Sequence, residues 1–312
     1  MRLSSRYSAL PFLLLLLTIG VFSRTNSARA QQTDSLRSAL EVEHNSPDWA
    51  LIREHLPDPA TASAQRLEME GDILRARRFP ADALDYYRYA MTRGGDVGAL
   101  MNKMGVTELE LGNVVLARAY IQSGLKIRKK NAQAWNNLGA IEFMQRNLGG
   151  AIRDYKKAIK YDQQAAVYHS NLGLAYVDKK EYESARAQLM LALKIDPEVF
   201  QHHNAAGSSL HILSTGDRAA FHFEMAKAYA KLGNKPEMLH ALQTAGEAGL
   251  DIQEAMAKDA IMVHYIDDPD VVTLIREAKS LRASRMAGGS VASAAPPLPP
   301  STTAPAPAPT PR

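Results

Sequence analysis

Histidine is the residue type in this sequence that most readily suggests chemistry, because four of its histidines gather in a short stretch. They are His202, His203, His211 and His222. Neutral imidazole is a common ligand of zinc and other transition metals. His202 and His203 are adjacent, so on a helix their side chains point in different directions rather than toward one ion. A histidine-based metal site near residues 202–222 remains an alternative, and the preferred interpretation has no metal site and no cofactor.

Carboxylates and nucleophiles give a weaker signal for catalysis. Glu108 and Glu142 stand one above the other in a repeating pattern described below, and two carboxylates can act as general acid and base. Solvation, or pairing with Lys or Arg, explains them better. The chain has no cysteine, and no metalloprotease, serine-hydrolase, P-loop or dinucleotide-binding motif occurs in it. We therefore predict that the protein is not an enzyme.

The first 30 residues have the composition of an export signal. Arg2 and Arg6 precede an apolar stretch over residues 9–22, and Ala28-Arg29-Ala30 offers a cleavage pattern. This stretch is shorter than the roughly 20 residues that a helix needs to span a bilayer, and an uncleaved anchor is the alternative. We expect residues 1–30 to be a signal peptide. The mature chain is then exported, to the periplasm or as a secreted protein, with no integral membrane span.

Removal of the expected signal peptide leaves an electrically neutral chain. The sequence has 37 Lys and Arg against 33 Asp and Glu, and residues 1–30 hold four arginines and no acid. Nucleic-acid-binding proteins carry a basic surface that neutralises phosphates. We therefore expect a protein or peptide partner and no nucleic acid.

A period of 34 residues organises the middle of the chain. Gly71, Gly105, Gly139 and Gly173 form one column, and alanines recur twelve residues after each glycine. In each unit, apolar or small residues at spacings of three and four predict two amphipathic helices separated by a polar turn. The sequence thus predicts an all-α chain of helical hairpins that stack to bury their apolar faces. The four units are 64–97, 98–131, 132–165 and 166–199.

These units resemble the tetratricopeptide repeat (TPR). The match is best over residues 166–199, where Leu172, Gly173, Tyr176, Ala185 and Pro197 fit the consensus. Glu108 and Glu142 depart from it, since tyrosine is usual in that column. The resemblance implies a TPR solenoid of antiparallel helical hairpins that serves in protein binding.

The flanking segments are expected to cap this solenoid. A Gly-Ser-containing stretch after Pro197 breaks the register, because Gly and Ser are poor residues for a helix interior. An in-phase fifth unit containing Gly207 and Phe223 is the alternative to this break. The preferred division has N-terminal capping helices at 31–63, a connector at 200–217, a further TPR-like hairpin at 218–251, C-terminal capping helices at 252–285 and a disordered Pro/Ala-rich tail at 286–312.

The resemblance also implies a binding groove, since the first helix of each TPR hairpin lines the inner face. Asparagines recur there beside apolar columns, and an asparagine side chain both donates to and accepts from a peptide backbone. Capping of turns and contact with water are alternative roles for these asparagines. Lys103 is the one basic residue at the positions where the family binds a partner's carboxylate. The candidate groove residues are Asn102, Val106, Leu109, Asn136, Asn137, Ala140, Phe143, Asn171, Leu174 and Val177.

The sequence as a whole therefore predicts a non-enzymatic scaffold or adaptor in the cell envelope. It would bind a partner peptide or helix in the concave groove of the repeats. Two alternatives stay open: an accessory subunit with a metal site near residues 202–222, and a structural spacer of the envelope.

Overall fold

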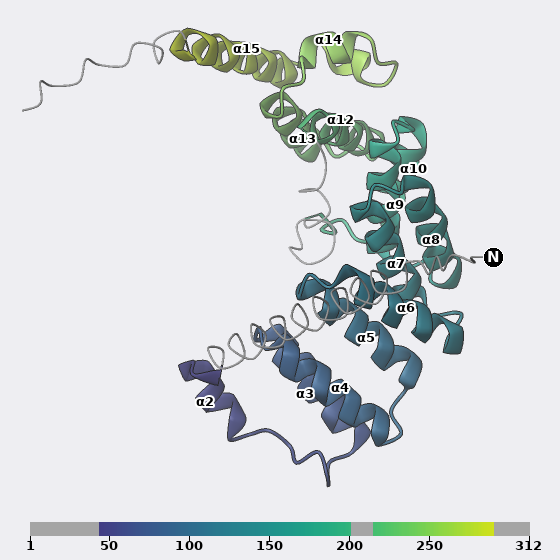
Figure 1. The fold of residues 1–312 in the computed structure, drawn as a ribbon. Helices are drawn as coiled ribbons and strands as arrows, with labels where there is room; N and C mark the ends of the chain where they lie inside the picture. The colour runs from purple at the N-terminus through teal and green to yellow at the C-terminus, as the bar shows by residue number, and fades with distance from the viewer. Residues whose placement is uncertain (1–43, 201–214, 290–312) are drawn as a thin grey trace, which may run out of the picture. The chain divides into compact units, whose positions relative to one another are not determined.

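The computed structural model describes residues 44–200 and 215–289, and the regular elements within these ranges are all helices (Figure 1). Contacts divide the chain into unit 1, Met1–Ile141, and unit 2, Glu142–Arg312. The all-α fold of helical hairpins that the 34-residue period predicts is confirmed. The expected signal peptide lies outside the described residues, as do most of the expected connector and the tail beyond residue 289.

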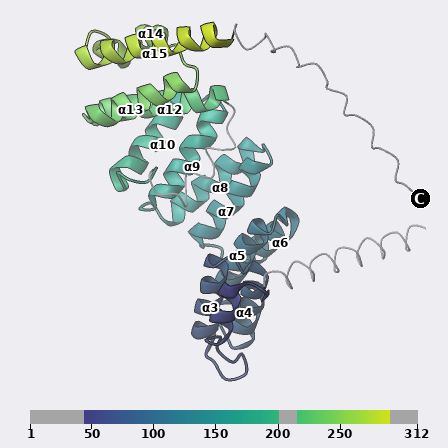
Figure 2. The same ribbon diagram turned by 90° about the vertical axis from the view of Figure 1, so that its left-hand side faces the viewer.

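The described part of unit 1, from residue 44 on, consists of a short helix, two helical hairpins and the start of a third. Within the first two hairpins the paired helices lie side by side, as Figures 1 and 2 both show. Its elements are α2 (Pro47–Arg53), α3 (Ala64–Ala76), α4 (Pro80–Thr92), α5 (Val97–Glu110) and α6 (Val114–Ile127), followed by α7 (Ala132–Met144), which crosses into unit 2.

The described residues of unit 2 continue with helical hairpins and end in two short helices followed by a long one. α9 packs against both α8 and α10, and α12 pairs with α13. The elements are α8 (Leu148–Tyr161), α9 (Ala166–Asp178), α10 (Tyr182–Ile195), α12 (Thr215–Lys231), α13 (Lys235–Glu247), α14 (Ile252–Ala257), the 3-10 helix η1 (Met262–Tyr265) and α15 (Pro269–Gly289).

Local sequence explains where these helices begin. Ser63 accepts a hydrogen bond from the backbone N–H of Arg66 at 3.2 Å, and Asp96 accepts one from Ala99 at 3.0 Å. Such side chains satisfy donors that have no partner within the helix. Pro80 occupies the start of α4, where a missing N–H is harmless.

The glycine column marks the point where the two helices of a hairpin approach closely. A Cβ atom added at Gly105 would lie 2.5 Å from Cγ1 of Ile121, and one at Gly173 would lie 2.7 Å from Cδ2 of Leu189. Both distances are well below the 3.5–4.0 Å of ordinary contact between carbon atoms. The glycine is thus required by the large side chain that the second helix places opposite it.

A second column of the repeat lies in the turns. Arg78, Gly112, Arg146 and Lys180 have φ of 69°, 79°, 62° and 64°, and each is the second residue beyond the first helix of its hairpin. Gly233, with φ of 72°, holds the same place between α12 and α13. The left-handed conformation costs a residue other than glycine about 1–2 kcal/mol. The fold therefore imposes one turn geometry even where the sequence offers no glycine.

Two boundaries differ from the sequence-based ones. Helix α15 continues to Gly289, so residues 286–289 are helical and the expected start of the tail at 286 is corrected. Helix α12 begins at Thr215, within the stretch expected to be connector. Among the residues that the structure describes, no helix is both long and apolar enough to cross a membrane.

Candidate functional site

The ten predicted groove residues separate clearly by exposure. Six are buried by the chain itself, and a buried side chain offers no surface to a partner. The buried six are Asn102, Asn136, Phe143, Asn171, Leu174 and Val177. The half-buried four are Val106 and Leu109 on α5 and Asn137 and Ala140 on α7. These four residues, all in unit 1, are called the inner surface below.

The predicted groove residues of unit 2 belong to its core. Phe143 is 1 % exposed and joins Leu174, Val177 and Phe221 in one hydrophobic cluster, and Asn171 is buried as well. This burial corrects the expectation that Phe143 presents its aromatic ring to a partner. The side chain is an anchor of the core of unit 2.

The asparagines of unit 1 bond to each other between successive hairpins. Nδ2 of Asn137 on α7 donates a hydrogen bond to Oδ1 of Asn102 on α5 at 3.0 Å. One role of this pair is therefore to hold α5 and α7 in register. Asn137 is the more exposed of the two residues and lies beside Val106 and Ala140 in the repeat pattern.

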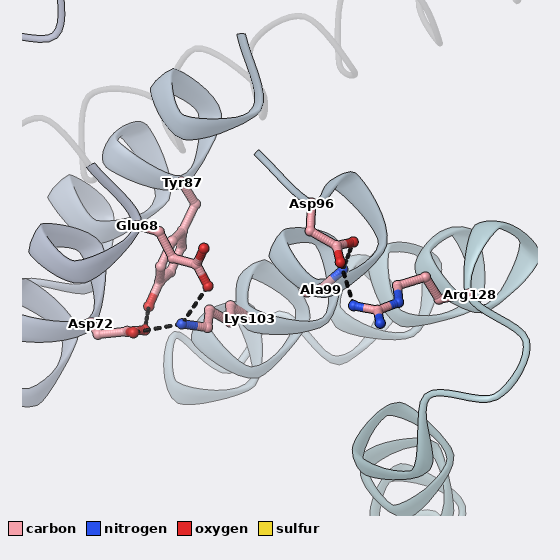
Figure 3. A network of polar contacts seen from close by, with 7 residues as sticks. All are labelled: Glu68, Asp72, Tyr87, Asp96, Ala99, Lys103 and Arg128. Carbon is pink, nitrogen blue, oxygen red and sulfur yellow. Dashed lines mark hydrogen bonds and ion pairs between the residues drawn. The ribbon is translucent and has the colours of Figure 1, made fainter. Parts of the chain in front are cut away.

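Lys103 is held by two carboxylates of the preceding hairpin (Figure 3). Its Nζ lies 2.8 Å from Oε1 of Glu68 and 2.5 Å from Oδ2 of Asp72, and the hydroxyl of Tyr87 donates to Oδ1 of Asp72 at 2.8 Å. Burial acts to lower the pKa of Lys103, but the hydrogen bonds to Asp72 and Glu68 outweigh it and raise that pKa. A lysine neutralised in this way is poorly placed to bind the carboxylate of a partner.

A second ion pair in Figure 3 ties the two ends of one hairpin together. Asp96 caps α5 through Ala99 and also pairs with Arg128, the residue that follows α6. A Cβ atom at Gly98 would lie 2.5 Å from Cγ of Arg128, so the arginine stem packs directly on the helix start. This contact is structural, and it fixes the start of α5 that carries the inner surface.

The two glutamates considered as catalytic carboxylates have a structural role instead. Oε2 of Glu108 accepts a hydrogen bond from Nδ2 of Asn113 at 2.8 Å, and Oε2 of Glu142 accepts one from Nδ2 of Asn147 at 2.6 Å. Each asparagine begins the second helix of the same hairpin, so the pair closes the turn. Both glutamates are buried. The sequence pattern favoured solvation or a basic partner for these glutamates, whereas the hydrogen-bond partner in the structure is the asparagine five residues later.

Of the four histidines between residues 202 and 222, one, His222, lies in the described part of the chain. His202, His203 and His211 lie outside the described residues. His222 on α12 is half-buried, and burial, followed by the nearby His240 and Arg218, lowers its pKa to about 4. Within residues 44–200 and 215–289, no cluster of three His, Asp or Glu side chains is arranged to hold a metal ion.

A buried network of charges links three segments of unit 2. Glu224 on α12 binds Arg186 of α10 at 3.0 Å and also Lys227, and Nζ of Lys227 lies 2.9 Å from Oδ2 of Asp259. Burial raises the pKa of Glu224, and its cationic partners oppose that rise. The charges are mutually satisfied, as buried ions must be, and the network joins α10, α12 and the segment after α14.

The end of unit 2 contains a cavity of about 270 Å³ between α13, the start of α14 and α15. Its lining is mainly apolar, with Leu250, Ile252, Leu274 and Ile275 among the lining residues and Glu247 also lining it. Nothing in the described residues converges on it with the chemistry of a catalytic site.

Comparison with protein families finds one kind of repeat in both units. Residues 68–132 and residues 166–199 match families described as Tetratricopeptide repeat, and residues 141–180 match a family described as TPR repeat. The resemblance inferred from the glycine and alanine columns is thereby confirmed. No curated protein matched the sequence.

Several solved structures are similar to this chain at low sequence identity. TTC0263, a thermophilic TPR protein of Thermus thermophilus, is 18% identical, with a TM-score of 0.42 over 69% of this chain and 98% of that one. MamA of Desulfovibrio magneticus RS-1 is 17% identical, with a TM-score of 0.41 over 59% and 94%. YrrB, described as a TPR protein with an unusual peptide-binding site, is 14% identical, with a TM-score of 0.40 over 65% and 91%.

Proposed function

We propose that this chain, which contains tetratricopeptide repeats, is a non-enzymatic scaffold that binds a protein partner on the inner surface of unit 1. The observation that carries the proposal is the row of half-buried side chains Val106, Leu109, Asn137 and Ala140 on the first helices of successive hairpins. These are the predicted groove residues that the chain leaves accessible.

The chemistry of the inner surface suits an extended peptide. Val106, Leu109 and Ala140 provide aliphatic area for the apolar side chains of a partner. Asn137 uses one of its amide hydrogens on Asn102, and an asparagine side chain can form up to four hydrogen bonds. Its remaining capacity suits the backbone of a strand or loop, which is a sequence-tolerant mode of recognition.

Charge contributes little to this mode of binding. Lys103, on the same helix as Val106 and Leu109, is bound to Glu68 and Asp72. This cation is thus already paired. We therefore expect an uncharged segment of the partner to bind, with an affinity that changes little with salt.

The location of the protein is part of the proposal. We propose export to the periplasm or outside the cell, because residues 1–30 have the pattern of a signal peptide. Amino-terminal sequencing of the exported protein tests this directly. The expected first residue is Gln31, and recovery of an uncleaved chain in the membrane fraction would contradict it.

Site-specific photo-cross-linking in cells tests the binding surface even while the partner is unidentified. A photoreactive benzoylphenylalanine is introduced at Val106 or Asn137, and, as a matched control, at the exposed Gln122 on α6. We expect discrete adducts from positions 106 and 137 and none from position 122. Adducts from position 122 alone would move the binding surface elsewhere. Absence of adducts from all three would favour a structural spacer.

A further inference from the structure

Helix α6 begins with aliphatic side chains that the fold leaves in solvent. Val115 is 81 % exposed and Leu116 is 50 % exposed, and Leu111, in the turn before them, is 36 % exposed. Single exposed aliphatic residues are common on protein surfaces, but a group of three at one helix start is an apolar patch.

The other hairpins show that this patch is not required by the repeat. The positions that correspond to Val115 and Leu116 are filled by Ala81 and Asp82 at the start of α4. They are filled by Gly149 and Gly150 in α8, and by Glu183 and Ser184 in α10. Small or polar residues thus satisfy the same place in the fold three times. Since packing does not explain the aliphatic side chains, contact with another molecule is the remaining physical use for them.

A cluster of arginines lies next to the patch. Arg75, at the end of α3, reaches Glu110 across the hairpins at 3.7 Å, and Arg77 and Arg78 are exposed in the turn that follows. Burial raises the pKa of Glu110, and the positive charges of both Arg75 and Arg78 oppose that rise. Because Glu110 immediately precedes Leu111, Arg75 and Arg78 lie near the turn that carries Leu111 and leads into Val115 and Leu116.

We propose that Arg75, Arg77, Arg78, Leu111, Val115 and Leu116 form a turn-edge surface that docks an acidic peptide segment carrying aliphatic side chains. Guanidinium groups pair with carboxylates through two parallel hydrogen bonds, and the Arg75–Glu110 contact places a carboxylate among these arginines. The aliphatic side chains of the segment would cover Val115 and Leu116. This surface is separate from the inner surface and does not depend on the proposed function.

An anionic membrane is a poorer match for the same side chains. Recognition of lipid head groups typically uses about four to eight basic residues, and this edge has three arginines, one of which is already paired. The side chains of Leu111, Val115 and Leu116 together carry fewer carbons than one myristoyl chain, which by itself gives only marginal membrane binding. The peptide is therefore the occupant that the charge and the apolar area favour.

Fluorescence anisotropy with a defined probe tests the proposal. The first probe is a fluorescein-labelled peptide in which pairs of aspartates alternate with pairs of leucines. A second, comparison probe has asparagine in place of every aspartate. The variants of the full chain are the double changes Arg77→Ser with Arg78→Ser and Val115→Ser with Leu116→Ser. We expect each double change to weaken binding of the aspartate probe at least tenfold, and the asparagine probe to bind at least tenfold more weakly to the unaltered protein.

Matched controls are available on the far end of α6 and on the inner surface. Ile127→Ser removes another exposed aliphatic residue, Lys129→Ser with Lys130→Ser removes two other exposed charges, and Asn137→Ala alters the inner surface. We expect all three controls to bind the probe within twofold of the unaltered protein. Equal loss in these controls, or no loss in the turn-edge variants, would overturn the proposal. Binding to phosphatidylglycerol vesicles through the same residues, without peptide binding, would also overturn it.

Discussion

Replacement of Gly105 by alanine tests the packing of the repeat most sharply in unit 1. The new Cβ atom would lie 2.5 Å from Cγ1 of Ile121 and 3.0 Å from the backbone oxygen of Ala117, both on α6. A backbone oxygen cannot turn aside as a flexible side chain can. Helices α5 and α6 would therefore have to separate by roughly 1 Å to restore ordinary contact distances.

The expected effect is the difference between two opposing terms. Overpacking of a core typically destabilises a protein by about 1–3 kcal/mol, while alanine in place of glycine within a helix contributes about 1 kcal/mol of stability. We expect Gly105→Ala to lower the free energy of unfolding by up to about 2 kcal/mol, which is the remainder after these two terms are combined.

Tryptophan fluorescence during urea unfolding measures the stability of unit 1, which contains Gly105. Both tryptophans of the chain, Trp49 and Trp135, lie in unit 1. The matched control is Gly98→Ala on the same helix, where the three atoms nearest to the new Cβ atom would all be side-chain atoms of Arg128, with Cγ at 2.5 Å. We expect this control to be less destabilising than Gly105→Ala, because one side chain has to shift there instead of two helices.

A double-mutant cycle separates the clash from other causes. In an Ile121→Ala background the atom nearest to the new Cβ is absent, so Gly105→Ala should be less destabilising than in the unaltered protein. Equal effects of Gly105→Ala in the two backgrounds, or equal effects at Gly98 and Gly105, would refute the packing explanation of the glycine column.

Three further predictions concern unit 2, each read by circular dichroism during urea unfolding. Lys180→Gly should stabilise the chain by up to about 1 kcal/mol, because glycine adopts the φ of 64° without strain; a loss of stability would count against this. His222, whose pKa is lowered to about 4, stays neutral in the fold while the unfolded chain takes up a proton below pH 6.5. Stability should therefore fall from pH 6.5 toward pH 4, by at most about 2 kcal/mol at pH 5, and His222→Phe should flatten that profile. Lys227→Met should destabilise by about 3 kcal/mol or more, because it removes one partner of buried Glu224; a neutral result would show that the network is relaxed by water.

The fold was predictable because each repeat needs a small residue at the point where its two helices approach closely. Gly105 and Gly173 each face a large side chain that lies sixteen residues later in the sequence. A single such pair could arise by chance. A glycine that recurs every 34 residues, each time sixteen residues before a large side chain, indicates that two helices approach at that point. The turns were less readable, because Arg78, Arg146 and Lys180 occupy a conformation that is usually marked by glycine.

The candidate site was predictable only in part, because sequence columns indicate direction on a helix and not exposure. Asn102 and Asn137 belong to neighbouring columns of predicted groove residues, yet they bond to each other between hairpins. Phe143 has the direction expected of a groove residue, but it lies in the core of unit 2. Phe143→Ala is therefore expected to lower stability by about 3–5 kcal/mol, as do other large aromatic truncations in a core.

The turn-edge surface was overlooked for a different reason. Val115 and Leu116 fit an amphipathic helix as well as any other aliphatic residues, and a sequence pattern assigns apolar residues to the core by default. Their exposure became visible only when α6 was placed in its hairpin. The useful signal in the sequence is the contrast with Asp82 and Glu183 at the corresponding positions of other units.

The most direct test of the scaffold proposal is the affinity of the cross-linked partner for variants of the inner surface. The double variant Val106→Ser with Asn137→Ala is compared with the unaltered protein and with Gln122→Ala on α6, at low and at high salt. Loss of one hydrogen bond and of one aliphatic contact is worth about 2 kcal/mol, or about 30-fold in affinity. We expect that loss in the double variant, no loss in the control and little change with salt. Unchanged affinity of the double variant would contradict binding on the inner surface of unit 1.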